Sequence, residues 1–258
     1  NSDIHNINSL KLKNKYRCVI HLAAKAGVRQ SQAKSSEYLM NNIIGHNNVL
    51  NFSLENSERM VYASSSSVYG EHKNNFSTES DHTDNPTSIY GISKKTCEMI
   101  SENCFLNSSF PQIGLRFFTV YGEYGRPDMA YWIFTKNIIE SKEITLFNNG
   151  EMLRDFTYID DIVDGIIRCI ELNNYDKHSV LNLGRSEVRK TSEMLRIIEN
   201  LLNKKAIVTS KPRLPIDVSL TSSSNIHANS LLGYDPKISL EFGLEKFVKW
   251  YMRFKKEI

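Results

Sequence analysis

The sequence has few cysteines, and none of them are close together. Four occur in 258 residues, at Cys18, Cys97, Cys104 and Cys169. No CxxC motif or Cys/His spacing typical of a zinc site is present, so we expect neither a disulfide framework nor a metal site. Unpaired thiols of this kind fit a reducing compartment, and the sequence therefore predicts a cytoplasmic protein.

Long apolar runs and an excess of one sign of charge are also missing. No apolar stretch approaches the ~20 residues that a membrane-spanning helix needs, and no signal peptide is recognisable after Asn1. The 32 basic and 29 acidic residues leave a net charge of +3, and the basic residues are scattered. The composition is that of an ordinary soluble protein, with neither membrane nor nucleic acid as a partner.

The first half of the chain alternates short apolar runs with amphipathic segments. Buried parallel strands are predicted at residues 17–24, 59–65 and 112–118. Apolar residues at helical spacing predict helices over 35–56 and 89–105, with a polar loop over 66–88. Strands and helices that alternate in this way are typical of right-handed crossovers, so we expect an α/β fold with a doubly wound parallel sheet.

The pattern changes after residue 120. Helices are predicted over 129–142, 160–172, 191–204 and 239–254. Thr191 or Ser192 is the expected N-cap of the third of these helices, and Ser239 that of the last. Asn149-Gly150, between two apolar runs, predicts a β-hairpin, and residues 179–184 predict another short strand.

One pair of residues suggests acid–base chemistry. Tyr90 and Lys94 are four residues apart at the start of a predicted helix, so their side chains share a face. An ammonium group near a phenol lowers the pKa of the phenol and yields a base near neutral pH. Alone, this spacing is common on solvated helices, and the serine run "ASSSSVYG" at residues 63–70 is by composition typical of a linker.

The order of several longer motifs is far more specific. "VIHLAAKAGVRQS", "VYASSSSVYG", "YGISK", "GLRFFTVYGEYGRPDMA", "RDFTYIDDIV" and "FVKWY" follow one another between about Asp3 and Tyr251. This series resembles the extended short-chain dehydrogenase/reductase superfamily and, within it, the UDP-glucuronate 4-epimerases. The resemblance implies a partial Rossmann-type NAD-binding domain over 1–120. It also implies a smaller, mainly nucleotide-sugar-binding domain over 121–258, with a segment near 178–190 returning to the Rossmann core.

The resemblance implies an activity and a set of catalytic residues. The reaction would be NAD-dependent 4-epimerisation of UDP-glucuronate to UDP-galacturonate through a 4-keto intermediate, for surface polysaccharide biosynthesis. Tyr90 would take the proton of the sugar 4-hydroxyl, and Ser65 would orient the substrate. Lys94 would lower the Tyr90 pKa and hold the nicotinamide ribose. Hydride would pass to NAD and return, so the cofactor would recycle.

Other positions match binding residues of the same family. For the substrate these are Ser66, Ser67, Thr119 and Arg126 near the glucuronate carboxylate, and Arg29, Arg154 and Asp217 near the uridine diphosphate. For the cofactor they are Asp3, Ile4, Ala23, Ala24, Asn42, Ala63, Ser64 and Phe117, together with Tyr90 and Lys94. The residue types suit these ligands, because a buried carboxylate needs several donors and the arginine fork matches a diphosphate.

The sequence also departs from the family pattern. The resemblance begins after the first βαβ unit, whose GxxGxxG turn binds the cofactor pyrophosphate, so we expect an N-terminally truncated chain or an incomplete record of a longer one. Residues 216–219 read IDVS where the family commonly has GDVP. Two alternatives stay open: another extended short-chain nucleotide-sugar epimerase or dehydratase, and an inactive truncated paralogue that keeps only the fold. Ser66 and Ser67 argue against a dehydratase, which typically carries an acidic pair there.

The resemblance also implies a second copy of the chain as a partner. The family forms homodimers through two helices of each subunit. The helices predicted over 35–56 and 89–105 would supply this interface here. Their apolar stripes are compatible with that role, although such stripes commonly face a core.

Overall fold

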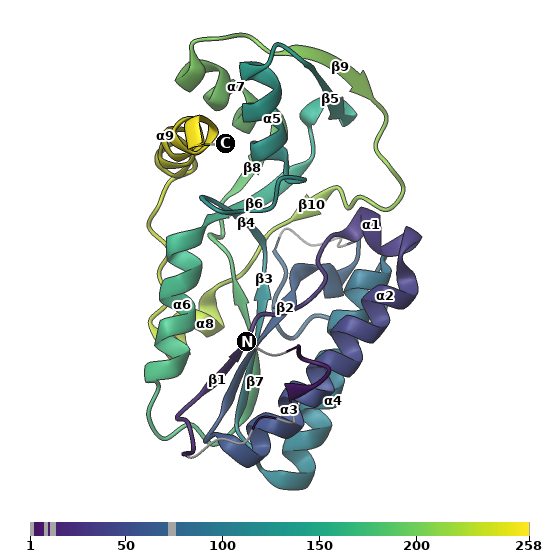
Figure 1. Cartoon of the computed structure of the whole chain (residues 1–258), viewed down its shortest axis with the longest axis vertical. Helices are drawn as coiled ribbons and strands as arrows, with labels where there is room; N and C mark the ends of the chain where they lie inside the picture. Colours follow the sequence, from purple (N-terminus) through teal and green to yellow (C-terminus); the bar gives the residue numbers. More distant parts are fainter. Residues whose placement is uncertain (1–2, 8–9, 11–13, 72–75, 258) are drawn as a thin grey trace.

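The structure is a computed structural model that describes residues 3–7, 10, 14–71 and 76–257. Figure 1 shows two parts arranged along the long axis of the molecule. One part is a sheet with helices on both faces, and the other is a smaller assembly of short strands and helices. Among the described helices, none is long and apolar enough to cross a membrane.

The larger part contains a parallel sheet of four strands in the order β1-β2-β3-β7. These strands are β1 (Val19–His21), β2 (Met60–Ser65), β3 (Gln112–Phe117) and β7 (His178–Leu183). Layers of helices cover both faces of the sheet, so its strands consist of nearly continuous apolar residues. Fully buried examples are Val61, Ile113, Leu115 and Leu181.

Helices cover both faces of this sheet (Figure 1). One face carries α1 (Val28–Ala33), α2 (Ser35–Leu39), α3 (Gly45–Asn56) and α4 (Ile89–Ser108). The other face carries α6 (Ile159–Glu171) and α8 (Ile226–Leu232). The predicted doubly wound, parallel α/β architecture is therefore confirmed.

The helices and strands of this part have the predicted type, but their lengths differ from the prediction. The strand expected over 17–24 is only three residues long. The helix expected over 35–56 is present, but it contains a π-helical segment, η2 (Met40–Ile44). Such segments are rare and often occur at functional sites. The loop expected over 66–88 begins with a 3₁₀ turn, η3 (Ser66–Tyr69).

The smaller part has two short sheets. In one, β6 (Leu153–Tyr158) pairs with β4 (Thr119–Tyr121), β10 (Leu220–Thr221) and β8 (Val188–Lys190). In the other, β5 (Glu143–Phe147) pairs with β9 (Ile207–Lys211). The helices are α5 (Ala130–Ile139), α7 (Thr191–Leu202) and α9 (Leu240–Glu257). Tyr121, Tyr131, Ile144 and Phe247 belong to the buried core that these elements share.

The hairpin predicted from Asn149-Gly150 is wrong. β5 and β6 flank this pair but belong to different sheets, so they do not pair with each other. The turn itself is real, because Asn148, Asn149 and Gly150 have φ angles of 49°, 52° and 74°. It directs the chain from one sheet into the next, and the long-range pairing of β5 with β9 decides the partner.

One of the two predicted helix caps is present. The Phe242 N–H donates to Ser239 Oγ at 3.2 Å, which confirms the cap at the start of α9. The cap predicted at Thr191 or Ser192 is wrong, because α7 begins directly after Lys190. The Thr191 hydroxyl instead donates to the Met152 carbonyl at 3.2 Å. That bond ties the start of α7 to the residue that precedes β6.

Candidate active site

The candidate site lies where β2 ends and α4 begins. Ser65 is the last residue of β2, and Tyr90 is the second residue of α4. Ser88 caps α4 by accepting the Gly91 N–H at 3.0 Å. A Cβ atom on Gly91 would lie 2.4 Å from the Ser67 carbonyl oxygen, so only glycine lets α4 start against the serine turn. The carboxyl end of a parallel strand is where open α/β sheets bind ligands.

The serine run is ordered structure and not a linker. Ser64 is buried, and its hydroxyl donates to Glu98 Oε1 at 2.5 Å. Ser65 Oγ accepts the Ser67 N–H at 3.1 Å and so closes the turn η3. Ser66 and Ser67 are half-buried within this turn. The serines therefore occupy different environments: Ser64 is buried against Glu98, Ser65 caps the turn, and Ser66 and Ser67 lie within it.

Two groups favour the ionised form of Tyr90. Burial raises the pKa of the phenol, whereas a hydrogen bond with the Ser65 hydroxyl and the positive charge of Arg126 lower it. The Ser65 hydroxyl and the Tyr90 phenol therefore lie close to each other. The outcome is a pKa above the ordinary value for tyrosine.

Lys94 contacts the main chain of β2. Its Nζ atom donates to the Ala63 carbonyl at 2.8 Å, and only 4% of the residue is exposed. The lowering of the Tyr90 pKa expected from Lys94 stays a prediction, since the ammonium reaches back to the main chain of β2 in this arrangement. Burial also lowers the pKa of Lys94, and Cys97 and Glu98 raise it.

Arg126 approaches the site from the loop before α5. Its Nε and Nη2 atoms donate to Asp128 at 2.9 and 3.0 Å. A Cβ atom on Gly27 would lie 3.3 Å from the Tyr38 hydroxyl and 3.6 Å from Arg126 Nη2, so these side chains meet there. Tyr38 in turn packs edge-on against Tyr90, with ring centroids 6.4 Å apart.

The three predicted diphosphate-binding residues form a second group. Arg29 makes a two-pronged ion pair with Asp217, at 3.2 Å from Nε and 2.6 Å from Nη2. Its guanidinium also lies 4.4 Å from the centre of the Phe147 ring. Arg154 donates to the Val218 and Ser219 carbonyls at 2.7 and 3.3 Å. Arg29 and Arg154 thus both contact the segment 216–219, which contains Asp217.

The predicted cofactor residues are in several places. Ala23, Ala24 and Phe117 lie at or just after the carboxyl ends of β1 and β3, and Ala63 lies two residues before the end of β2. The buried Asn42 amide accepts the Lys25 N–H at 2.7 Å and donates to Ser93 Oγ at 3.0 Å, so it fixes the loop after β1. The Ile4 side chain packs on Gly45 of α3, three residues after Asn42 in the chain.

The remaining predicted substrate residue is Thr119. It opens β4 and is half-buried, two residues beyond the end of β3. Tyr38 and Glu98 are residues of this region that the sequence analysis missed. Tyr38 carries no motif that would identify it, whereas Glu98 follows Lys94 by four residues and therefore shares its helix face.

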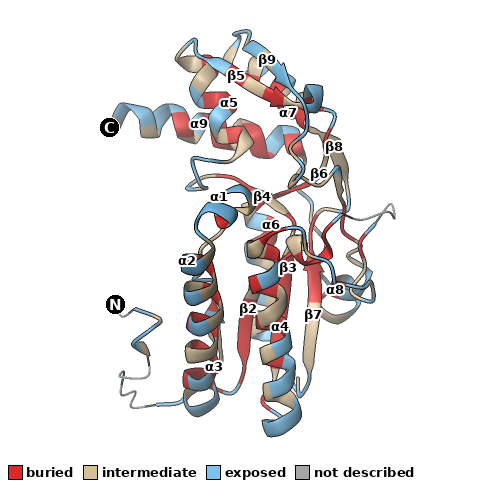
Figure 2. Cartoon of the chain, turned by 90° about the vertical axis from the view of Figure 1, so that its right-hand side faces the viewer, coloured by how far each residue is buried: buried red, intermediate tan, exposed pale blue. Residues whose placement is uncertain are grey.

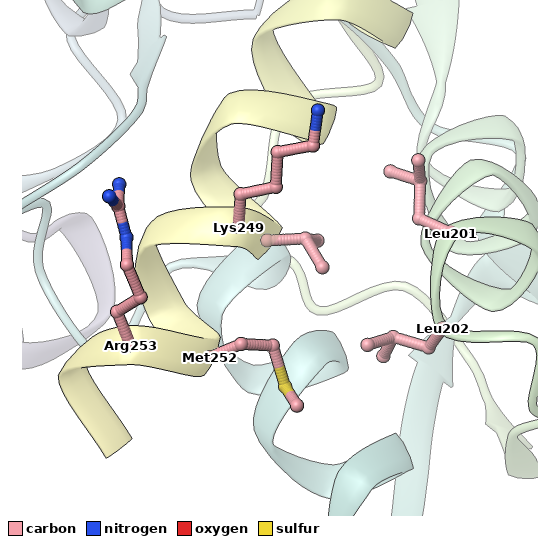
Figure 3. Close-up of a pocket in the computed structure, with 6 residues that line it drawn as sticks. Leu201, Leu202, Lys249, Met252 and Arg253 are labelled. Carbon is pink, nitrogen blue, oxygen red and sulfur yellow. The ribbon is translucent and has the colours of Figure 1, made fainter. Parts of the chain in front are cut away.

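A groove of about 610 Å³ lies elsewhere, between α7 and α9. Figure 3 shows the leucines of α7 facing Met252 and Lys249 of α9. It is lined by Leu201, Leu202, Val248, Lys249, Met252 and Arg253. None of the predicted site residues lines it, and no group of acidic, histidine or cysteine side chains in the described part of the chain is suited to hold a metal ion.

Comparisons with known proteins place this geometry in a family. The profile of the NAD dependent epimerase/dehydratase family matches residues 2–184. An uncharacterised protein of Methanocaldococcus jannaschii is 43% identical over 91% of this chain and 72% of its own length. UDP-glucuronate 4-epimerase 5 of Arabidopsis thaliana is 41% identical over 92% of this chain and 58% of its own length.

A solved structure gives the same result. UDP-glucuronic acid 4-epimerase from Bacillus cereus, in complex with UDP-glucuronic acid and NAD, superimposes with a TM-score of 0.88. The two sequences are 31% identical, and the match covers 98% of this chain and 79% of that one.

Proposed function

Because the chain belongs to the NAD-dependent epimerase/dehydratase family, we propose that it catalyses the 4-epimerisation of UDP-glucuronate to UDP-galacturonate through a 4-keto intermediate. The proposal includes a cytoplasmic location and a role in surface polysaccharide synthesis. It also divides the chain near residue 120 into a cofactor-binding and a substrate-binding half. The observation that carries the proposal is the contact of Tyr90 with Ser65 beside Arg126, at the carboxyl end of β2.

The residues around this contact fit a nicotinamide cofactor. Small side chains lie near the carboxyl ends of β1 and β2, namely Ala23, Ala24 and Ala63. Lys94 has three N–H donors, and the Ala63 carbonyl accepts one of them. Lys94 would therefore hold ribose hydroxyls with the others. Bound NAD would supply a reversible hydride acceptor for the sugar C4.

Proton transfer would be the task of the chain itself. Tyr90 would take the proton of the 4-hydroxyl, because its phenol is the titratable group in contact with Ser65. The Ser65 hydroxyl would bind the same sugar oxygen and stabilise the phenolate. Arg126 would favour the phenolate further, since its charge lowers the Tyr90 pKa.

The carboxylate of the substrate needs particular control in this reaction. A 4-keto uronate is a β-keto acid, and such acids lose carbon dioxide readily. Donors that hold the carboxylate in the plane of the ketone prevent overlap between the breaking bond and the carbonyl π system. We assign this task to Arg126, Ser66, Ser67 and Thr119. The half-buried serine turn and the exposed Arg126 fork support the assignment.

The diphosphate would bind among the arginines of the second group. Arg29 and Arg154 both approach the segment 216–219. Asp217 pairs with Arg29, and its negative charge also acts on Arg154. Arg29 is half-exposed, with 48% of its side chain accessible. A diphosphate can compete with Asp217 for this guanidinium, because both offer paired oxygens to the same fork.

Replacing Arg126 by alanine tests the substrate assignment. The purified protein is expected to interconvert UDP-glucuronate and UDP-galacturonate without added NAD. Arg126→Ala is expected to lower kcat/KM for UDP-glucuronate by about 10- to 100-fold, because a hydrogen bond to a charged group contributes about 1.5–3 kcal/mol. The loss for UDP-glucose should be smaller, and both values follow from chromatography of the UDP-sugars.

A matched control separates this effect from a general loss of charge. Arg253→Ala removes an arginine that lines the groove between α7 and α9, far from Tyr90 in the chain, and should leave both substrates unaffected. Equal losses for the two UDP-sugars in Arg126→Ala would contradict the carboxylate assignment.

We also propose that the protein is a homodimer. α2 and α4 pack side by side, as do α3 and α4, and Figure 2 shows all three on one face. This face exposes a row of large apolar side chains, namely Met40, Ile44, Ile92, Met99 and Leu106. A second copy would cover this row, since exposed apolar patches of this kind commonly mark interfaces.

A charge in this row is expected to separate the subunits. Met99 is 58% exposed in the single chain and would be covered by the second copy. Met99→Glu would therefore place a carboxylate in the interface. We expect the dimer dissociation constant to rise at least about tenfold in sedimentation velocity experiments. Leu201→Glu is the control, since Leu201 is also exposed but lies on α7. Dissociation by Leu201→Glu alone would move the interface to the other part of the molecule.

A further inference from the structure

A buried ion pair lies directly behind the candidate site. Glu98 of α4 and Arg116 of β3 are both 4% exposed. Arg116 Nε donates to Glu98 Oε1 and Nη2 donates to Oε2, both at 2.9 Å. The two-pronged geometry fixes the orientation of both side chains as well as their separation.

The same carboxylate also contacts β2. The Ser64 hydroxyl donates to Glu98 Oε1 at 2.5 Å, and Ser64 directly precedes Ser65. Glu98 follows Lys94 by one helical turn on the same face of α4. One carboxylate therefore joins the helix that carries Tyr90 and Lys94 to the strand that carries Ser65.

The network continues from Arg116 to the serine turn. Arg116 Nη1 donates to the Tyr69 hydroxyl at 2.8 Å, and this hydroxyl donates to Asn182 Oδ1 at 2.7 Å. Tyr69 is the last residue of η3, so the end of the turn is held too. Five elements, α4, β2, β3, β7 and η3, thus meet at one buried group of polar side chains.

We propose that Glu98 and Arg116 are positioning residues that hold α4 against β2 so that Tyr90 stays within hydrogen-bond reach of Ser65. The catalytic consequence rests on the proposed function, whereas the contact between Tyr90 and Ser65 does not. A helix can slide along a sheet if only apolar side chains join them, because apolar contacts are not directional. A bidentate ion pair with a third donor permits one register only.

A purely structural role and a positioning role predict different effects when both partners are replaced by apolar residues. Breaking a buried ion pair is strongly destabilising, but replacing both partners with apolar residues is often neutral or stabilising. A purely structural pair would therefore be dispensable as a pair. A positioning pair would not, because its apolar replacement restores stability without restoring the register of α4.

The test compares Glu98→Gln with the double variant Glu98→Leu/Arg116→Met. The double variant removes both buried charges. Lys95, which lies 3.9 Å from Glu98, loses a partner but is partly exposed. The double variant should therefore remain folded even if Glu98→Gln does not. We expect each folded variant to lower kcat about tenfold or more with KM unchanged, because small misplacements of reacting groups are costly. Arg59→Lys is the control: Arg59 is a buried arginine at the other end of β2, where it donates to the Leu172 carbonyl.

A second measurement does not depend on activity. Tyrosine labelled with ¹³C at Cζ gives one NMR resonance per tyrosine, and Tyr90→Phe assigns the one from Tyr90. Ser65→Ala removes the hydrogen bond to Tyr90 and so defines the shift that its loss produces. We expect both ion-pair variants to move the Tyr90 resonance in the same direction at neutral pH, and Arg59→Lys to leave it in place.

The outcomes separate the two proposals. A Tyr90 resonance that stays in place in both ion-pair variants overturns the positioning role, whatever the activity. If the parent protein has no epimerase activity but the Tyr90 resonance moves in the ion-pair variants, the positioning role is supported and the proposed function is contradicted. A double variant with the parent kcat and the parent resonance overturns the inference directly.

Discussion

A Tyr90→Phe variant is expected to lose about 10³-fold in turnover while keeping its fold, since a positioned general acid–base contributes about 10²–10⁴-fold. Only the hydroxyl is removed, so the edge-on packing of the ring against Tyr38 stays possible. The hydroxyl is the atom that contacts Ser65 and titrates under the influence of Arg126. Turnover is measured as the approach to equilibrium between the two UDP-sugars, and the fold by far-UV circular dichroism.

A half-buried tyrosine elsewhere provides the control for this substitution. The Tyr175 hydroxyl donates to the Gln112 carbonyl at 3.4 Å, at the opposite end of β3 from the site. Tyr175→Phe should therefore change stability slightly and turnover not at all. Turnover of Tyr90→Phe at the parent rate would show that Tyr90 is not the base. A combined loss of turnover and circular dichroism signal would show that the tyrosine is structural.

The sequence predicted the elements whose periodicity is strong. β2, β3 and α4 lie within a few residues of their expected ranges, because buried strands and amphipathic helices have distinct apolar patterns. β9 was missed because it lacks such a pattern: Ile207 and Val208 are more than 40% exposed, and the strand lies at an edge. Burial produces the pattern, and where burial is absent no pattern exists to be found.

Contacts within the candidate site were less predictable than the residues that make them. The spacing of Tyr90 and Lys94 placed both on one helix face, but the length of the lysine side chain lets it reach Ala63 instead. Arg29 and Asp217 were assigned separately to a diphosphate, whereas they pair with each other across 188 residues of sequence. Neither contact follows from local spacing, because each depends on how distant segments are packed.

Three histidines predict that the protein loses stability in mild acid. His21 and His46 are buried with ring centroids 5.4 Å apart. Burial and the nearby charge of Lys94 lower the pKa of His21 to about 4, and burial lowers those of His46 and His178. His46 Nε2 contacts Ser101 Oγ at 2.9 Å, and His178 Nε2 contacts the Tyr62 hydroxyl at 3.0 Å. Glu98 and Glu102 partly oppose the lowering at His178.

The sign of the effect follows from proton binding. Between pH 6.5 and about 4, His21 is protonated in the unfolded chain but neutral in the folded protein. The unfolded state then binds more protons, so the free energy of unfolding decreases as the pH falls through this window. The difference of about 2.5 units at His21 corresponds to about 3 kcal/mol. Above pH 6.5 the histidines should leave the free energy of unfolding unchanged, because they are neutral in both states.

Urea denaturation at a series of pH values measures this slope. His21→Asn is expected to flatten it by up to about 3 kcal/mol between pH 6.5 and 4, because the titrating group is gone. His82→Asn is the control, since its side chain is 98% exposed, and should reproduce the parent slope. If His21→Asn retains the full slope, His21 does not cause the acid sensitivity, and carboxylates that lose their ion pairs are the alternative cause. The two causes differ in their pH windows, because carboxylates in ion pairs act mainly below pH 5.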